Sequence, residues 1–173
     1  MTDPSREPRE LAEDVHYLLR GLGATLAVGE SLTGGLVGAQ LTSVPGASET
    51  FLGAVTAYAT AAKATLLDVD TALLERVGAV DPAVAVAMAR GARLRFGATF
   101  GLATTGVAGP DGQDGKDPGT VHLAVAGPAG ERARSLLLPG DRDQIRAAAV
   151  AAALGLLVEE LRQETAGAGK RPG

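Results

Sequence analysis

A serine lies in a turn of small residues near the start of the chain, where residues 29–35 read Gly-Glu-Ser-Leu-Thr-Gly-Gly. An apolar run at 24–28 precedes this turn and predicts a strand, while the run at 33–42 has the pattern of a helix. Active-site residues of α/β proteins often follow the carboxyl end of a strand. Backbone N–H groups at the start of such a helix can accept an anion, and here they would be those of Thr33, Gly34 and Gly35. Ser31 is a candidate nucleophile, although a serine at a helix start is equally well explained as an N-cap.

A serine nucleophile needs a base, and the sequence offers few. Cysteine is absent, and histidine occurs only at positions 16 and 122. Lys63 has alanine on both sides, an apolar setting that can lower the pKa of an amine and let it accept a proton. Pairing of serine with lysine is a known variant of the Ser–His–Asp triad. The alternative is that Lys63 is a solvated helix lysine, and that Tyr58 is a packing residue with an exposed hydroxyl.

Other polar residues lie where predicted strands end. The segments at 29–35, 45–48, 56–63 and 105–119 are expected to gather in one cleft of an open α/β sheet. They add Ser48, Thr105 and the glycines of a long loop to the candidate site. Arg142 and Arg146 are one turn apart near the start of the last predicted helix and could bind a phosphate there. The alternative is a solvated charge cluster with Asp141 and Asp143.

The composition limits the classes of function. The 173 residues are 46% hydrophobic and 21% charged, which is typical of one soluble globular domain. A net charge of −4 disfavours a nucleic-acid partner. No segment has the roughly 20 apolar residues that span a bilayer, and the polar N-terminus does not resemble a signal peptide. The lack of cysteine excludes disulfides and thiolate chemistry, and two histidines disfavour a histidine-rich metal site. We expect a cytoplasmic protein whose flat, alanine-rich helices favour a homo-oligomer.

Apolar periodicity and turn residues predict the order of the elements. Helices are expected at 9–22, 33–42, 59–67, 68–77 and 81–96, with a last helix that starts at 139–141 and runs through Leu161. Strands are expected at 24–28, 51–58, 100–105, 120–126 and 133–138. Early alternation favours parallel crossovers, and the late hairpin at 127–130 adds antiparallel strands. The prediction is a single three-layer α/β/α domain with a mixed, mostly parallel sheet over residues 9–163, between disordered tails at 1–8 and 164–173.

Several short motifs occur in a fixed order along the chain. After residues 29–35 come Val44-Pro45-Gly46-Ala47-Ser48, Thr56-Ala57-Tyr58 and Lys63-Ala64-Thr65-Leu66-Leu67. They are followed by Thr104-Thr105-Gly106-Val107-Ala108-Gly109-Pro110-Asp111-Gly112, Gly119-Thr120-Val121 and Gly140-Asp141-Arg142. Over about residues 9–163 this ordered set resembles the CinA C-terminal domain family, which includes the nicotinamide-nucleotide amidohydrolases.

The resemblance implies an activity and a role for each matching residue. The reaction would be hydrolysis of the carboxamide of nicotinamide mononucleotide to nicotinate mononucleotide and ammonia, a step of the pyridine nucleotide cycle that salvages NAD, without a metal or organic cofactor. By resemblance, Ser31 is the nucleophile, Lys63 the general base, and Tyr58 a neighbour that shuttles the proton or orients the lysine. Substrate-binding positions would be Thr33, Gly34, Gly35, Ser48, Thr105, Gly106 and Arg142, with Ser48 and Thr105 holding the amide or ribose and Arg142 the phosphate.

The chain also departs from the family pattern. Thr60 stands where Asn is common, which could change a hydrogen bond beside Tyr58. Leu32 replaces a frequent Cys, and Asp68 a usual Gly. Larger members carry an N-terminal domain that this sequence lacks. Two alternatives stay open: a nucleotide-binding or interaction module without turnover, and a hydrolase of another small amide.

Overall fold

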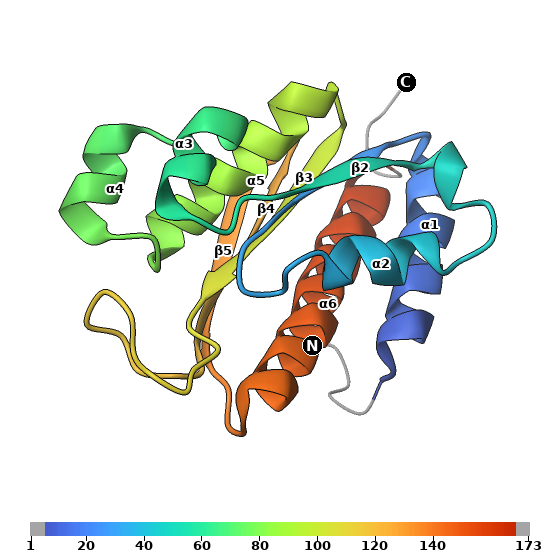
Figure 1. Cartoon of the computed structure of the whole chain (residues 1–173). Helices are drawn as coiled ribbons and strands as arrows, with labels where there is room; N and C mark the ends of the chain where they lie inside the picture. Colours follow the sequence, from blue (N-terminus) through green and yellow to red (C-terminus); the bar gives the residue numbers. More distant parts are fainter. Residues whose placement is uncertain (1–5, 169–173) are drawn as a thin grey trace.

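The computed structural model describes residues 6–168 and consists of one sheet between helices (Figure 1). The helices are α1 (Pro8–Leu22), α2 (Leu36–Thr42), α3 (Thr60–Leu67), α4 (Thr71–Val77), α5 (Pro82–Phe96) and α6 (Arg142–Ala168), with a 3-10 turn η1 (Ala47–Glu49). The strands are β1 (Leu26–Glu30), β2 (Phe51–Thr56), β3 (Phe100–Gly106), β4 (Thr120–Gly127) and β5 (Gly130–Leu137). Their order across the sheet is β2-β1-β3-β4-β5.

The sheet is mixed, as predicted. Strands β2, β1 and β3 are parallel to one another, and β4 and β5 continue the sheet as an antiparallel hairpin. The fully buried strand β1 lies between β2 and β3. Parallel strands end at the same edge of a sheet, so Glu30, Thr56 and Thr104 are neighbours there. The first residues after β1 and β2 therefore meet at this edge.

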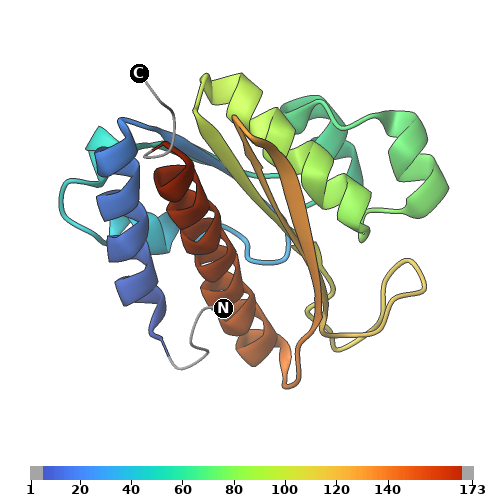
Figure 2. The same ribbon diagram turned by 180° about the vertical axis from the view of Figure 1, so that it is seen from behind.

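Helices cover both faces of the sheet, which gives the three layers that the sequence predicts (Figures 1 and 2). On one face α1, α2 and α6 pack on branched and large side chains such as Leu26, Val28 and Leu102. On the other face α3, α4 and α5 pack on small ones, including Ala27 and Ala103. The small residues let α5 lie close to the sheet, because backbone separation follows side-chain size.

Close packing continues between α3 and α5. A Cβ atom added at Gly91 of α5 would collide with the backbone of Leu67 at the end of α3. Glycine at this position therefore lets the two helices touch backbone to backbone. Since Lys63 is one turn before Leu67, this contact also fixes how far Lys63 stands from the sheet.

Helix ends follow local sequence signals. Asp81 caps α5 by accepting a hydrogen bond from the Ala83 amide at 2.8 Å, as its position before Pro82 predicts. Helix α2 starts at Leu36 rather than at the predicted residue 33. Gly34 and Gly35 have φ angles of +61° and +99°, which no helical residue adopts, so the turn after Ser31 is longer than expected.

The structure shows helix in parts of the predicted tails. Pro8 is already the first residue of α1, and α6 continues through Ala168, so residues 164–168 are helical rather than disordered. The prediction was wrong there because it relied on apolar periodicity, which the segment after Thr165 lacks. Alanine favours helix even without such a pattern. Residues 1–5 and 169–173 lie outside the described residues. Within residues 6–168, no helix is both long and apolar enough to cross a bilayer.

Candidate active site

The fold brings Ser31 and Lys63 into direct contact. Ser31 directly follows β1, and Lys63 lies in the first turns of α3, which begins just after β2. The Lys63 Nζ is 2.9 Å from the Ser31 Oγ, within hydrogen-bonding distance. The Lys63 side chain is fully buried, and Ser31 is 7% exposed. A nucleophile and a base in contact at a buried site are what a Ser–Lys mechanism requires.

Two backbone carbonyls orient the amine of Lys63. Its Nζ is 2.9 Å from the Ala57 oxygen and 3.3 Å from the Tyr58 oxygen. A neutral amine has two N–H groups and one lone pair. The protonated amine donates to all three oxygens, that of Ser31 included. In the neutral amine, donation of both N–H groups to the two carbonyls leaves the lone pair for the Ser31 hydroxyl. The geometry thus suits an amine that accepts the serine proton.

Burial supplies the neutral amine. It lowers the pKa of Lys63 from 10.5 to about 8, against the opposing effect of the Asp114 carboxylate. At pH 7.5 such a lysine is neutral about a quarter of the time. A solvated helix lysine, the alternative that the sequence left open, is excluded by the burial of the side chain.

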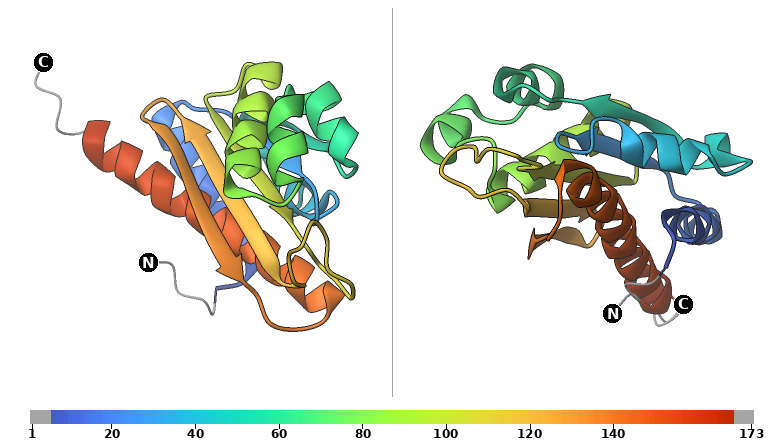
Figure 3. Two further views of the ribbon diagram at one scale, coloured as in Figure 1. Left: turned by 90° about the vertical axis from the view of Figure 1, so that its left-hand side faces the viewer. Right: turned by 60° about the horizontal axis from the view of Figure 1, so that its bottom comes forward.

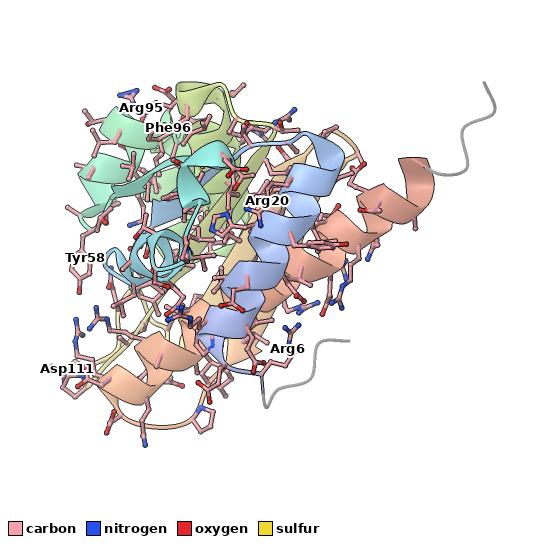
Figure 4. The ribbon with its side chains drawn as sticks, turned by 90° about the vertical axis from the view of Figure 1, so that its right-hand side faces the viewer. Arg6, Arg20, Tyr58, Arg95, Phe96 and Asp111 are labelled. Atoms are coloured by element: carbon pink, nitrogen blue, oxygen red, sulfur yellow. The ribbon has the colours of Figure 1, made fainter. Side chains whose placement is uncertain are left out.

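A pocket of about 230 Å³ opens over Ser31. Of the predicted site residues, it is lined by Ser31, Tyr58, Thr105, Gly106 and Arg142. The other lining residues come mainly from the long loop after β3, with Asp111 and Gln113 supplying polar side chains. Figure 4 shows Tyr58 and Asp111 along one edge of the molecule, and Figure 3 shows the loop beside the start of α6.

Arg142 connects two parts of the pocket rim, the long loop after β3 and Tyr58. It donates to the Gly109 carbonyl at 2.7 Å and to the Tyr58 hydroxyl at 3.0 Å. Tyr58 was expected to shuttle a proton or to orient Lys63. Its backbone oxygen does orient the lysine, but its hydroxyl contacts Arg142 instead. Arg142 has no acidic partner within 4.0 Å among the described residues, so its charge is available to an anion.

The predicted polar contact of Thr105 is directed into the protein. Its hydroxyl donates to the Ala79 carbonyl at 2.7 Å, and the Ala79 amide donates to Asp114 at 2.8 Å. The carbonyl of Ala79 is thus bound by Thr105 of β3, and its amide by Asp114 of the long loop. Thr105 lines the pocket but also fixes the connection between α4 and α5.

The predicted anion site at Thr33, Gly34 and Gly35 is largely filled by the protein itself. The buried Glu30 carboxylate accepts hydrogen bonds from the amides of Gly35, Val37 and Gly38 at 2.8–3.0 Å. The Thr33 hydroxyl donates to the same carboxylate at 2.7 Å, and the Gly34 amide donates to the Ser31 carbonyl at 3.0 Å. The amides of Gly34 and Gly35 are therefore already satisfied inside the chain, the first by the Ser31 carbonyl and the second by the Glu30 carboxylate at the start of α2.

Two amides near Ser31 are still without an acceptor. Within residues 6–168, no group accepts a hydrogen bond from the N–H of Leu32 or of Thr33. Leu32 lines the pocket and directly follows Ser31, the candidate nucleophile. Its amide is therefore the better placed donor for an oxyanion that forms on a carbonyl attacked by Ser31.

Ser48 does not belong to this pocket. It is exposed in η1, which precedes β2, whereas the pocket lies beyond the carboxyl ends of β1 and β2. The carbonyl of Thr50, two residues later, accepts a hydrogen bond from the Leu26 amide at the start of β1. Ser48 is thus at the opposite edge of the sheet from Ser31, because a residue that leads into a parallel strand lies at the amino edge.

Sequence reasoning missed the roles of Glu30, Asp114 and Arg146. A glutamate at the end of a buried strand, with two glycines four and five residues later, was the available signal for Glu30, since a buried carboxylate needs donors. Arg146 was paired with Arg142 as a phosphate ligand, but it binds the carbonyls of Leu32 and Thr33 and does not line the pocket. No sequence signal pointed to Asp114.

Two further observations concern Thr60 and metal binding. Thr60 is exposed and makes no side-chain hydrogen bond within the described chain, yet the Ser31–Lys63 contact is formed. Among residues 6–168, no three Asp, Glu or His side chains are close enough together to hold a metal ion.

The ordered motifs and this geometry agree with a comparison against known proteins. The CinA C-terminal domain model matches residues 8–161. The chain belongs to the CinA C-terminal domain family. It is 56% identical over 140 residues to a CinA-like protein of Frankia casuarinae. The aligned region covers 81% of this chain and 32% of that protein. A CinA-like protein of Anaeromyxobacter sp. is 49% identical over 154 residues, covering 88% and 38%. This chain therefore spans about a third of the length of these relatives.

Solved structures of the family share the fold. A CinA superfamily protein from Klebsiella pneumoniae superposes with a TM-score of 0.88 at 30% identity, covering 91% of this chain and 99% of that one. A competence/damage inducible protein from Agrobacterium tumefaciens gives a TM-score of 0.85 at 34% identity, covering 94% and 99%. The single mixed-sheet α/β architecture is thus that of the family.

Proposed function

We propose that this chain is an amidohydrolase that converts nicotinamide mononucleotide to nicotinate mononucleotide and ammonia. The observation that carries the proposal is the contact of Lys63 Nζ with Ser31 Oγ at 2.9 Å, with two backbone carbonyls accepting from the same amine. An activated serine beside a pocket is the arrangement used for acyl transfer. The class of substrate is the one that the resemblance to the family implies.

The first half of the reaction forms an ester. Lys63 takes the proton of Ser31 as its Oγ attacks the carboxamide carbon. The negative charge that develops on the carbonyl oxygen is stabilised by the Leu32 amide, with that of Thr33 as the second candidate donor. Protonated Lys63 then gives its proton to the leaving nitrogen. Ammonia departs, and the nicotinoyl group stays bound to Ser31.

The second half reverses these roles. A water molecule takes the place of ammonia, and Lys63 removes its proton as it attacks the ester. The Ser31 oxygen leaves and recovers its proton from Lys63, which releases nicotinate mononucleotide. Arg142 at the rim is the candidate phosphate ligand, because it lines the pocket and its charge has no carboxylate partner within residues 6–168.

The test is an ammonia-release assay over nicotinamide mononucleotide, nicotinamide and other small amides. Ser31→Ala and Lys63→Ala should each abolish release while circular dichroism and thermal unfolding show an intact fold. Ser43→Ala and Lys116→Ala are matched controls, since both side chains are exposed outside the pocket, and they should retain wild-type activity. Activity that survives in both site variants would refute the mechanism. Tight binding of the mononucleotide without ammonia would instead indicate a binding module.

A further inference from the structure

Arg146 contacts the Ser31 turn from behind the pocket. This arginine is in the second turn of α6 and donates to the Leu32 carbonyl from Nε at 3.0 Å and to the Thr33 carbonyl from Nη2 at 3.2 Å. Its remaining nitrogen is 3.9 Å from Asp143. The planar guanidinium thus binds two successive carbonyls, which a single ammonium could not do in the same geometry.

Holding a carbonyl also fixes the next amide. A trans peptide is planar, so the N–H of Thr33 points away from the Leu32 oxygen that Arg146 holds. In the same way, the Leu32 amide points away from the Ser31 oxygen, which accepts from Gly34 at 3.0 Å. Arg146 also holds the Thr33 oxygen, whose peptide carries the Gly34 N–H that binds the Ser31 oxygen. Arg146 thus orients the Thr33 amide directly and the Leu32 amide through Gly34.

The turn is shaped to receive this arginine. Gly34 lies directly against it, since a Cβ atom there would be 3.2 Å from Nη2 of Arg146. The φ angle of +61° at Gly34 also disfavours any other residue. Arg142, one helical turn earlier on α6, lines the pocket instead. The start of α6 thus presents one arginine to the pocket and one to the turn that carries the nucleophile.

We infer that Arg146 is a positioning residue that orients the Leu32 and Thr33 amides to receive the oxyanion formed during attack by Ser31. The inference rests on the proposed Ser31 nucleophile but not on the identity of the substrate. It predicts that Arg146 affects states with a tetrahedral, negatively charged centre and has little effect on ground-state binding.

The test compares two ligands. 3-Pyridineboronic acid forms a bond from boron to the Ser31 oxygen, the serine proton passes to Lys63, and the product is a tetrahedral boronate anion. Nicotinate mononucleotide has a trigonal carboxylate and a phosphate. Arg146→Met should weaken boronate binding about tenfold or more and lower kcat for ammonia release by about 10- to 100-fold, by analogy with loss of an oxyanion donor. Binding of nicotinate mononucleotide should change less than about twofold.

Arg142→Met is the matched control and should show the opposite pattern. It should weaken nicotinate mononucleotide about tenfold and leave the boronic acid within about twofold. Arg146→Lys keeps the charge but cannot bind both carbonyls in parallel, so it should behave like Arg146→Met. Its thermal unfolding shows whether the fold persists if the methionine variant is unstable.

Three outcomes would overturn the inference: wild-type boronate affinity and kcat in Arg146→Met, full activity in Arg146→Lys, or equal losses for the two ligands. The proposed function fails separately. Unchanged boronate binding by Ser31→Ala would refute the nucleophile, and with it the inference. A wild-type protein that shows the expected boronate pattern without releasing ammonia from nicotinamide mononucleotide would refute the substrate and support the role of Arg146.

Discussion

Replacing Lys63 by methionine, an unbranched apolar residue of similar length, is expected to abolish catalysis and to stabilise the protein. Burial lowers the pKa of Lys63 from 10.5 to about 8, so charging the buried amine costs the folded state about 3 kcal/mol. Methionine removes this cost. It also leaves the Ala57 and Tyr58 carbonyls without a donor, which costs about 1 kcal/mol for each. The net gain below pH 8 is about 1 kcal/mol.

The pH dependence of that gain is the sharper test. The pKa of Lys63 is lower in the folded than in the unfolded state, so the cost of the charge is fully present below pH 8 and disappears as pH rises to 10.5. The methionine variant should lose its advantage over this range and become less stable than wild type at its upper end. Urea unfolding at pH 7, 9 and 10.5 measures the difference, with exposed Lys116→Met as the control. A difference in unfolding free energy between wild type and Lys63→Met that is constant across these pH values would refute the buried, deprotonating lysine.

Further predictions concern the pH profile, the phosphate and the cap of α2. The kcat/KM of ammonia release should rise with pH, with a midpoint at about 8. Because the Asp114 charge raises the pKa of Lys63, Asp114→Asn should move this midpoint to lower pH. The control Asp117→Asn, in the same loop, should not move it. Arg142→Met should raise KM for nicotinamide mononucleotide about tenfold and leave any turnover of nicotinamide unchanged, as steady-state kinetics would show. Glu30→Gln should lower the free energy of unfolding by about 3 kcal/mol in urea titrations, because its buried amide group would face N–H donors.

Local signals in the sequence predicted most of the fold. Helix ends with a strong stereochemical cause, such as Asp81-Pro82 at the start of α5, were correct to the residue. The start of α2 was not, because it depends on a hydrogen bond between the Glu30 side chain and amides up to eight residues away. Residue types and spacing indicate where a helix is possible, but such a carboxylate decides where it begins.

The candidate site was predicted in part. Ser31 and Lys63 follow neighbouring parallel strands, so their meeting follows from the topology once the strand order is known. Ser48 failed the same reasoning, since it precedes its strand and lies at the other edge. That the chain forms a homo-oligomer stays a prediction. The contact of Arg146 with the Ser31 turn depends on the distance between this turn and α6. The apolar periodicity of either segment does not predict that distance.

The contact of Gly91 with Leu67 makes a residue outside the pocket important for the geometry of the candidate site. Any side chain at position 91 would push the end of α3 outward, and Lys63, one turn earlier on that helix, would move away from Ser31. A natural variant with alanine there would keep every residue that lines the pocket, and we expect it to lose the proposed reaction. A survey of relatives that compares pocket residues alone would therefore misjudge which of them are active, and the glycine in the middle of α5 belongs in that comparison.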